Sequence, residues 1–275
     1  MLVSLIDTHT HFDVPEFDHD RAEQCVLAYQ NGIKHLVLIG FLAKNFSQMV
    51  ACQTQMAKFA IAPTAHLAFG LHPFYILQHQ PHDLDILESF IQTHPSVAIG
   101  EIGLDTFTDT MKMPDNYAKQ QTLFINQLAL AKHYQLPVML HIRKAHGDTL
   151  KLLKSEKFKN GGIAHSFSGG IQEAKAFVNL GFKIGITGQV TNPNAKKLRN
   201  TLIELVKTVG LDSLVIETDC PDFTPVCCHT THGRRNTPAN LLFVLDELSA
   251  LLHLDKAELA SHLWHNSQSI LNLAE

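Results

Sequence analysis

The sequence predicts an α/β fold, specifically a (β/α)8 TIM barrel, and two observations indicate it. Short apolar or β-branched segments alternate with longer segments of helical periodicity along the whole chain. Because parallel strands need a crossover connection, usually a helix, this alternation favours a parallel sheet. Polar residues suited to metal binding also follow six of the short segments. Barrel enzymes carry their catalytic groups at that position, the carboxyl ends of the strands.

Eight strands are expected, which is the number that closes such a barrel. They span residues 2–6, 35–39, 65–69, 97–99, 138–140, 162–164, 182–186 and 213–216. Helices are expected at residues 20–31, 45–60, 84–93, 116–134, 171–180, 195–209 and 238–252, with a last helix from near Asp255. The helix at 116–134, for example, places Leu123, Leu128 and Ala131 at roughly helical spacing and ends before Pro137.

The domain organisation follows from the absence of any break in this pattern. No Pro/Gly/Ser-rich linker, charge block or internal repeat divides the chain, so residues 1–275 are expected to form a single domain. An open doubly wound sheet is the alternative architecture. Five cysteines without framework spacing indicate reduced thiols.

Charge and hydropathy restrict the location and the partners. The N-terminus lacks the basic and apolar pattern of a signal peptide, and the longest apolar run, residues 36–43, is far below the ~20 residues of a membrane span. A cytoplasmic protein with no membrane association and no obligate protein partner is expected. The net charge of −4 argues against broad electrostatic capture of duplex nucleic acid. The 18 histidines point instead to metal binding, because imidazole is the commonest metal ligand.

Residues able to bind metal ions or phosphate follow six of the predicted strands. Because the carboxyl ends of parallel barrel strands meet at one mouth, these segments are expected to converge. They are Asp7-Thr8-His9-Thr10-His11-Phe12-Asp13, Gly70-Leu71-His72-Pro73, Gly100-Glu101-Ile102-Gly103-Leu104-Asp105, His141-Ile142-Arg143, His165-Ser166-Phe167-Ser168-Gly169 and Glu217-Thr218-Asp219-Cys220-Pro221.

Four histidines and two carboxylates in these segments are the candidate metal ligands. Residues two apart on a strand point the same way, so the imidazoles of His9 and His11 can approach one ion. Imidazole and carboxylate suit Zn, Mn, Fe, Ni or, less well, Mg. Six ligands exceed the usual three of one catalytic ion, so two divalent ions are expected, and the two oxygens of Glu101 can bridge them. The ligand set is His9, His11, Glu101, His141, His165 and Asp219.

The other polar residues near these segments receive supporting roles. Ligating imidazoles are usually oriented by carboxylates or carbonyls, so Asp7, Asp13, Asp105 and Glu217 are expected to orient ligands or to be structural. The remaining histidines are expected at the surface or in packing contacts: His19, His35, His66, His79, His82, His94, His133, His253, His262 and His265.

Taken together and in this order, the motifs resemble those of the TatD family of metal-dependent deoxyribonucleases. The resembling set is His-x-His, Gly-Leu-His-Pro, Gly-Glu-Ile-Gly-Leu-Asp, His-x-Arg, His-x-Phe-Ser-Gly and Glu-Thr-Asp-x-Pro. It runs from about Ile6 to Asn240, and residues 165–169 and 183–186 are most similar to a branch of the family termed YjjV-like. The resemblance implies a TIM barrel of the metal-dependent hydrolase type.

The resemblance also implies a role for each matching residue. The ligands would divide into two groups that share one carboxylate, namely His9, His11, Glu101 and Asp219 for one ion and Glu101, His141 and His165 for the other. The implied activity is phosphodiester hydrolysis from DNA ends by metal-activated water. Asp219, which would orient or deprotonate that water, and the bridging Glu101 are therefore the expected catalytic residues.

Two further residues at the predicted mouth are candidates for binding the substrate. His72 and Arg143 are expected to contact a phosphate. A turn-capping role before Pro73 is the alternative for His72, and an ion pair with a nearby carboxylate is the alternative for Arg143.

The loop after Pro225 departs from the family's pattern, because it is longer and contains a Cys-Cys pair. Arg234 and Arg235 in this loop either bind substrate phosphate or face water. An extra zinc site is a further hypothesis, although its spacing matches no closed structural pattern. Its ligands would be Cys227, Cys228, His229 and His232.

Three functions are consistent with these residues. The first is a nuclease acting on DNA ends, preferring single strands, because a strand end can enter a barrel mouth and the middle of a duplex cannot. The second is a two-metal hydrolase of a small ester, amide, lactone or aminoacyl-tRNA, since a fold does not fix its function. The third, a catalytically silent metal-binding protein, is disfavoured because competent residues fill all six ligand positions.

Overall fold

The computed structural model describes residues 3–229 and 235–273. Its eight strands form one parallel sheet, and each strand pairs with the next one along the chain. This sequential order confirms the predicted barrel and excludes the doubly wound alternative, in which the strand order reverses. The strands are β1 Leu5–Thr10, β2 Ile33–Ile39, β3 Thr64–Phe69, β4 Ser96–Asp105, β5 Val138–Arg143, β6 Gly162–Ala164, β7 Phe182–Ile186 and β8 Leu214–Ile216.

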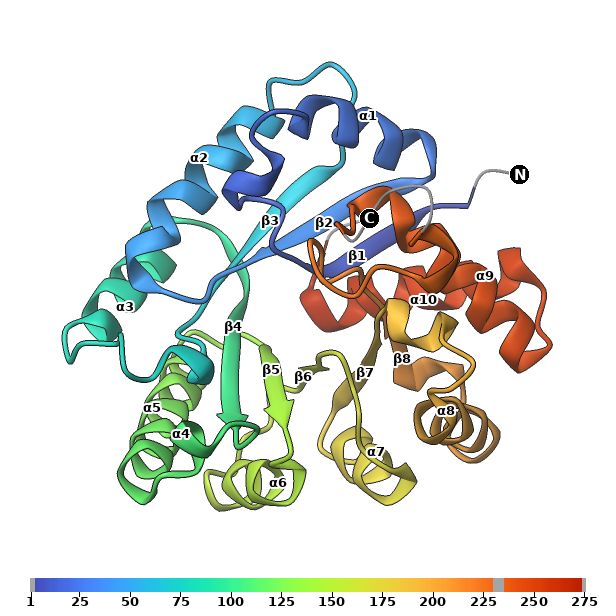
Figure 1. The fold of residues 1–275 in the computed structure, drawn as a ribbon. Helices are drawn as coiled ribbons and strands as arrows, with labels where there is room; N and C mark the ends of the chain where they lie inside the picture. Colours follow the sequence, from blue (N-terminus) through green and yellow to red (C-terminus); the bar gives the residue numbers. More distant parts are fainter. Residues whose placement is uncertain (1–2, 230–234, 274–275) are drawn as a thin grey trace.

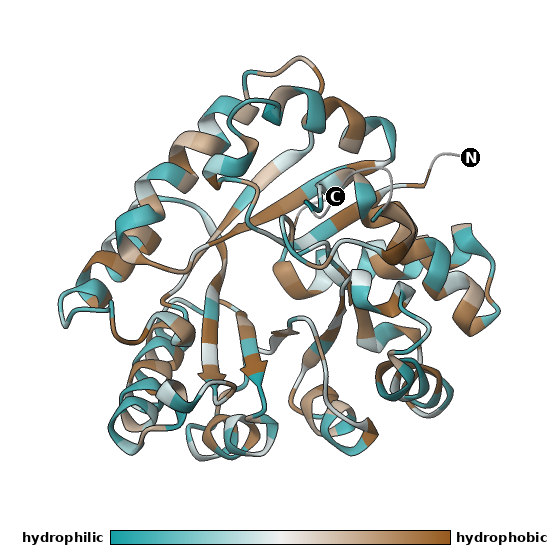
Figure 2. Ribbon diagram, viewed as in Figure 1, coloured by the Kyte–Doolittle hydropathy of each residue, from teal (hydrophilic) through white to brown (hydrophobic). Residues whose placement is uncertain are grey.

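Helices surround the sheet on its outer side (Figure 1). In Figure 2 the strands are largely brown, while the helices mix brown with teal, as expected when one face packs on the barrel and the other meets water. No helix within the described ranges is long and apolar enough to cross a membrane. The helices are α1 Arg21–Gln30, α2 Phe46–Met56, α3 Asp83–Thr93, α4 Asp109–Lys112, α5 Pro114–His133, α6 His146–Ser155, α7 Ile171–Val178, α8 Lys196–Thr208, α9 Leu241–Leu252 and α10 Lys256–Leu271.

Several element boundaries differ from those expected. The first strand lies at Leu5–Thr10 rather than at residues 2–6, so His9 is inside the strand and not after it. The fourth strand continues to Asp105, because its pairing with β5 extends beyond a register shift. Helix α6 was missing from the expected helices, since its first residues, His146-Gly147-Asp148, carry a weak helical signal.

The barrel is nearly closed, and the seam between β8 and β1 is joined by residues beyond the end of β8. The backbone N–H of Asp219 donates to the carbonyl of His9 at 2.9 Å. Thr218 donates to the Asp7 carboxylate from its backbone at 2.8 Å and from its hydroxyl at 2.5 Å. Burial raises the pKa of Asp7 to about 7. Asp7 therefore joins β1 to the segment after β8. Of its two expected roles, orienting a ligand or supporting the structure, these contacts fit the structural one.

The interior of the barrel has an apolar base and a polar mouth. A small apolar cluster, separate from the larger core under the helices, lies on the inner faces of the strands. Because side chains two apart lie on one face of a strand, Met139 lies below His141, and Ile163 lies below His165. The cluster consists of Val37, Ile39, Ala68, Ala98, Met139, Ile163, Val215 and Leu271.

Candidate metal centre and active site

Glu101 occupies the centre of the barrel mouth because glycines let three strands approach closely there. A Cβ atom on Gly70 would lie 2.4 Å from the carbonyl carbon of Gly100, so only glycine fits at that contact. The backbone N–H of Glu101 donates to the carbonyl of Gly40 at 2.8 Å. These contacts hold the Glu101 backbone among the ends of β2, β3 and β4 and leave its side chain inside the mouth.

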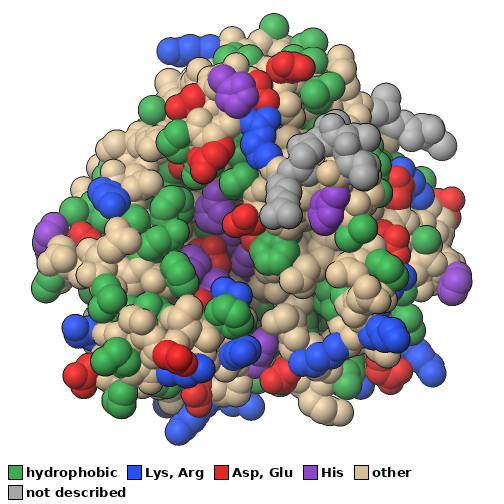
Figure 3. All heavy atoms as spheres, viewed as in Figure 1, with side chains coloured by type: hydrophobic (Ala, Val, Ile, Leu, Met, Phe, Trp, Pro, Cys, Tyr) green, Lys and Arg blue, Asp and Glu red, His purple; other side chains and the backbone are tan. Residues whose placement is uncertain are grey.

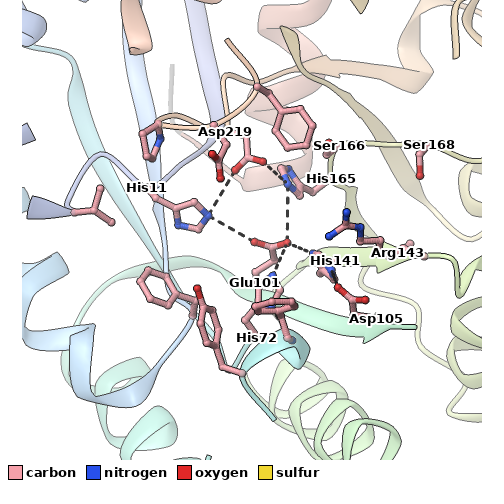
Figure 4. A pocket seen from close by; sticks show the side chains of 18 of the residues that line it. His11, His72, Glu101, Asp105, His141, Arg143, His165, Ser166, Ser168 and Asp219 are labelled. Atoms are coloured by element: carbon pink, nitrogen blue, oxygen red, sulfur yellow. Dashed lines mark hydrogen bonds and ion pairs between the residues drawn. The ribbon is translucent and has the colours of Figure 1, made fainter. Parts of the chain in front are cut away.

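The two carboxylate oxygens of Glu101 face different imidazoles. Oε2 lies 3.2 Å from His9 Nε2 and 3.7 Å from His11 Nε2. Oε1 lies 2.8 Å from His141 Nδ1 and 3.9 Å from His165 Nε2. The predicted ligands therefore converge in one place, although they come from five strands or strand ends (Figure 4).

Asp219 lies on the opposite side of the same imidazoles. Its Oδ1 is 3.6 Å from Nε2 of both His9 and His11, and its Oδ2 is 3.2 Å from His165 Nε2. The rings of His9 and His165 stack with centroids 3.4 Å apart. All six predicted ligands thus contact at least one other member of the set.

His9 provides a test of whether a metal ion fits this cluster. Its side chain is fully buried, and neither ring nitrogen has a hydrogen-bond partner among the described residues. A buried polar atom without a partner costs free energy, so such atoms in folded proteins are normally satisfied. A divalent ion between His9, His11 and Glu101, whose donor atoms lie within 4.8 Å of one another, would give a partner to one of these nitrogens, Nε2, which faces Glu101 Oε2 at 3.2 Å.

Two of the other imidazoles are oriented so that a lone pair of the neutral ring faces the centre. When one ring nitrogen donates its hydrogen to an oxygen, the other nitrogen of the neutral ring carries the lone pair that binds a metal. The outer nitrogens have acceptors: His11 Nδ1 lies 3.0 Å from Ile39 O, and His141 Nε2 lies 3.0 Å from Asp105 Oδ2. His165 Nδ1 lies 2.9 Å from Glu217 Oε1, as an ion pair without hydrogen-bond geometry.

His72 has the opposite orientation. Its Nδ1 accepts a hydrogen bond from the backbone N–H of Phe74 at 3.0 Å, so Nε2 of the neutral ring carries the hydrogen. That nitrogen lies 3.4 Å from Glu101 Oε1, and burial, followed by the charge of His141, lowers the pKa of His72 to about 4. His72 is thus a turn cap and a neutral hydrogen-bond donor at the same time. This tautomer argues against a ligand role, although His72, Glu101 and His141 are close enough to hold an ion.

The neighbouring His79 was missed by the sequence analysis, which treated it as a surface or packing residue. Its side chain is buried, and its Nε2 lies 2.8 Å from the carbonyl oxygen of His72. It therefore fixes the turn that carries His72. No motif signals this role, because the contact depends on how the turn Pro73–Tyr75 folds back.

The charges in the cluster are balanced between carboxylates and imidazoles. Burial by itself would raise the pKa of Glu101, but the surrounding imidazoles hold it well below its usual value. Burial lowers the pKa of His141, yet its hydrogen bonds to Asp105 and Glu101 outweigh burial and raise it to about 9. The carboxylates therefore stabilise positive charge at this place, and a divalent cation meets the same requirement.

The cluster lies at the bottom of a cleft of about 690 Å³. Figure 3 shows histidine and carboxylate side chains at the base of this hollow. Arg143 lines the cleft and is exposed. Its guanidinium lies 3.4 Å from the ring centroid of Phe107, and no carboxylate of the described residues forms an ion pair with it. In the described residues the side chain of Arg143 therefore packs on an aromatic ring and not in an ion pair, although its charge contributes to lowering the pKa of Asp105.

The loop after Pro225 contributes less than the sequence suggested. Arg235 does not line the cleft, because its guanidinium pairs with the carboxylate of Asp20 and stacks over Phe17. Arg234 and His232 lie outside the described residues. The metal-capable groups found in the described part of the chain include neither Cys227, Cys228 nor His229. None of the five cysteines, all of which lie within the described residues, forms a disulfide bond.

Asp13 is buried, and no hydrogen bond or ion pair joins its carboxylate to a ligand imidazole within the described residues. Burial raises its pKa to about 6, although the charge of His11 lowers it. The sequence analysis also missed the aromatic lining of the cleft. A signal was available, since Phe74 and Phe107 each follow a predicted site residue by two positions. The aromatic lining residues are Phe41, Phe74, Tyr75 and Phe223, with Phe107 under Arg143.

A TIM barrel with this cluster at its mouth defines the class of metal-dependent hydrolases. A family model described as "TatD related DNase" matches residues 6–272. The chain belongs to this family, as its motifs predicted.

Curated relatives and solved structures support the same assignment. The chain is 34% identical over 275 residues to the "Uncharacterized metal-dependent hydrolase YjjV" of Escherichia coli strain K12, covering 99% of this chain and 100% of that protein. It is 32% identical over 270 residues to the "Uncharacterized metal-dependent hydrolase YabD" of Bacillus subtilis strain 168, covering 98% and 99%. The crystal structure of the E. coli YjjV protein, a TatD homologue, matches with a TM-score of 0.87 at 33% identity and full coverage of both chains.

Proposed function

We propose that this protein is a two-metal deoxyribonuclease that removes nucleotides from DNA ends and prefers single strands to duplex. The observation that carries the proposal is the division of the imidazoles between the two oxygens of Glu101. His9 and His11 face Oε2, whereas His141 and, at longer distances, His72 and His165 face Oε1. A carboxylate with imidazoles around both of its oxygens could be shared by two cations.

The residues around Glu101 fit two ions. His9, His11, Glu101 and Asp219 would hold one of them, and Glu101, His141 and His165 would hold the other. When bound, a pair of divalent ions lowers the pKa of water and stabilises the charge of an in-line displacement at phosphorus. Asp105 lies 3.0 Å from His141 Nε2 and Glu217 lies 2.9 Å from His165 Nδ1, so each carboxylate could orient its imidazole with the other ring nitrogen toward the ions.

The protein's own side chains orient the substrate and move the proton. Asp219 has one oxygen toward His9 and His11 and the other toward His165, so it can orient the attacking water and accept its proton. His72 presents its Nε2–H to a phosphate oxygen, and Arg143 supplies a charged donor at the cleft wall.

The preference for single-strand ends rests on the shape of the site and the charge of the protein. The ligand cluster lies at the bottom of a cleft inside the barrel mouth, which a strand end can reach without unpairing a duplex. The net charge of −4 gives little affinity for long duplex by counterion release.

The proposal is tested on protein stripped of metal and reloaded with Mg²⁺, Mn²⁺, Zn²⁺ or Ni²⁺. End-labelled single-stranded and duplex oligonucleotides are incubated with each form, and the Asp219→Asn variant prepared in parallel is the control. Metal-dependent release of nucleotides, faster from single strands, supports the proposal. If no nucleotides are released above the control while a small ester, a lactone or an aminoacyl-tRNA is hydrolysed, the nuclease function is wrong and the alternative hydrolase function replaces it.

A further inference from the structure

The cleft has a cationic lip on the side of β4, β5 and β6. Arg143 lies flat on the ring of Phe107, which is 44% exposed, with 3.4 Å between the guanidinium carbon and the ring centroid. Lys144 Nζ lies 4.9 Å from the same centroid. Lys197 Nζ donates to the carbonyl of Ser168 at 3.2 Å, and Ser168 lines the cleft. Arg143 and Ser168 line the cleft, whereas Phe107, Lys144 and Lys197 (the last from α8) lie next to these lining residues. The cationic lip is defined as Phe107, Arg143, Lys144 and Lys197.

The opposite lip carries carboxylates. Glu16, in the short helix Pro15–Phe17, and Asp222, in the segment after β8, both line the cleft and are exposed. Neither forms an ion pair with a lysine or arginine among the described residues. The backbone N–H of Asp222 donates to the carbonyl of Asp219 at 2.9 Å, which places it on the β1–β8 side of the cleft. Figure 4 shows His11, on that side, across Glu101 from Arg143 and Ser168.

We propose that this charge asymmetry sets the path of the strand and limits the cleft to strand ends. The chain beyond the scissile phosphate leaves over the cationic lip, and Glu16 and Asp222 repel any phosphate that would continue on the other side. This inference rests on the proposed nuclease function and deepens it, because it assigns residues to the path and to the end requirement.

The chemistry of the two lips agrees with such a path. A single strand carries one negative charge per nucleotide, and Lys or Arg side chains along its backbone bind it with an affinity that falls as salt rises. Guanidinium planes and aromatic rings also stack on unpaired bases, and the Arg143–Phe107 pair offers both groups at one place. Like charges facing each other across an interface disfavour binding, so a continuous strand is excluded at the acidic lip.

The first experiment tests the cationic lip. We compare wild type with the double variant Lys144→Gln/Lys197→Gln on a 20-nucleotide single strand and on a dinucleotide, measuring kcat/KM against salt concentration. The matched control is Lys58→Gln/Lys159→Gln, which removes two exposed lysines from the loops that precede β3 and β6. These loops lie at the other end of the barrel.

The expected result is a loss of roughly tenfold in kcat/KM on the 20-mer and less than about twofold on the dinucleotide. The slope of log kcat/KM against log salt concentration on the 20-mer should become shallower by up to about 1.4. Each phosphate contact on a single strand contributes about 0.7 to this slope, and the variant removes two lysines. Equal losses on the two substrates, or the same loss in the control variant, would overturn the proposed path.

The second experiment tests the acidic lip with a circular single-stranded DNA, which has no end. The measured quantity is the ratio of circle nicking to trimming of a linear strand of the same sequence. The double variant Glu16→Gln/Asp222→Asn should raise this ratio at least about tenfold over wild type. An unchanged ratio in a variant that still trims linear DNA would refute the proposed role of the acidic lip in excluding strands without ends. Failure of the wild type to trim any DNA would instead refute the nuclease function.

Discussion

The base and the mouth of the barrel interior are formed by side chains on the same inward face of the same strands. The base is apolar, whereas the mouth is polar and ionisable. In the base, Met139, Ile163 and Val215 form part of an apolar cluster in which each of these side chains is fully buried. In the mouth, His141, His165 and Glu217 stand two positions further along the same three strands or strand ends. The strand alternation that places the first group in the interior also places the second group there.

This comparison separates what holds the barrel together from what performs chemistry. Burial of the apolar layer contributes to folding without any partner atom. The polar layer needs partners for every buried nitrogen and oxygen; here these are carboxylates and backbone groups such as Ile39 O and Phe74 N–H, and in the proposed site they would also be metal ions. Substitutions in the base should therefore change the free energy of unfolding, and substitutions in the mouth should change activity and metal affinity.

The largest effect is expected from Asp219→Asn. An amide accepts no proton from water and is a poorer ligand than a carboxylate, so activity should fall at least about 10²–10⁴-fold while the fold remains intact. Turnover, metal content and circular dichroism of the variant are compared with those of wild type. Near wild-type turnover at confirmed metal content would remove Asp219 from the mechanism.

The second prediction concerns the base. Met139→Ala removes a fully buried side chain that packs against Gly100. The free energy of unfolding should fall by about 2–5 kcal/mol, as measured by urea denaturation. Activity per folded molecule should change by less than about threefold. Met139→Leu, which nearly conserves volume, is the matched control and should cost less than about 1.5 kcal/mol. An activity loss far beyond the unfolded fraction would show that the two layers are not separable.

A smaller effect is expected from Glu217→Gln, which alters the partner of His165 Nδ1. Loss of such an orienting carboxylate typically lowers metal affinity or activity by about 10–100-fold. Asp7→Asn is the matched control, because Asp7 is equally buried but bonds to Thr218 at the seam. Isothermal titration with metal should show weaker binding for Glu217→Gln only. Equal weakening in both variants would mean that the effect is structural.

The smallest expected effect is a change in how the stability of the protein depends on pH. It comes from a pair of histidines at the end of the barrel opposite the mouth. His35 Nδ1 and His66 Nε2 lie 3.0 Å apart near the amino ends of β2 and β3. Burial, then the charge of His35, lowers the pKa of His66 to about 4 from 6.5. Between these pH values the unfolded chain binds more protons than the folded one, so this histidine makes stability fall as the pH drops.

The contribution of His66 to the slope of the unfolding free energy against pH is at most about 1.4 kcal/mol per pH unit, because one proton is involved. Replacing His66 by Gln should remove this contribution. The measurement is Tm at pH 7 and at pH 5 for metal-free wild type and variant, so that shared titrations cancel in the difference. An identical pH slope in the two proteins would show that His66 remains protonated in the fold.

The sequence predicted the barrel and the ligand set because both depend on local patterns. Alternating strand and helix segments leave few architectures other than a parallel sheet, and the six candidate ligands each lie within a strand or shortly after one. The predicted positions of the strand ends were less accurate. Val3-Ser4-Leu5-Ile6 is apolar enough to suggest an early strand, whereas the pairing of β1 with β2 continues to Thr10. Pairing partners, and not the residues alone, decide where a strand stops.

By itself, the sequence determined the fold class and predicted which side chains form the candidate metal-binding cluster. Backbone periodicity and residue chemistry are properties of the chain, so they can be read without coordinates. The tertiary structure decided the tautomer of His72, the stacking of Arg143 on Phe107 and the pairing of Arg235 with Asp20. Each of these depends on a partner brought close by folding. The hydrogen bonds, ring contacts and charges at distances of a few ångströms, and not the residue type, then fix whether a side chain binds an ion, contacts a substrate or supports the fold.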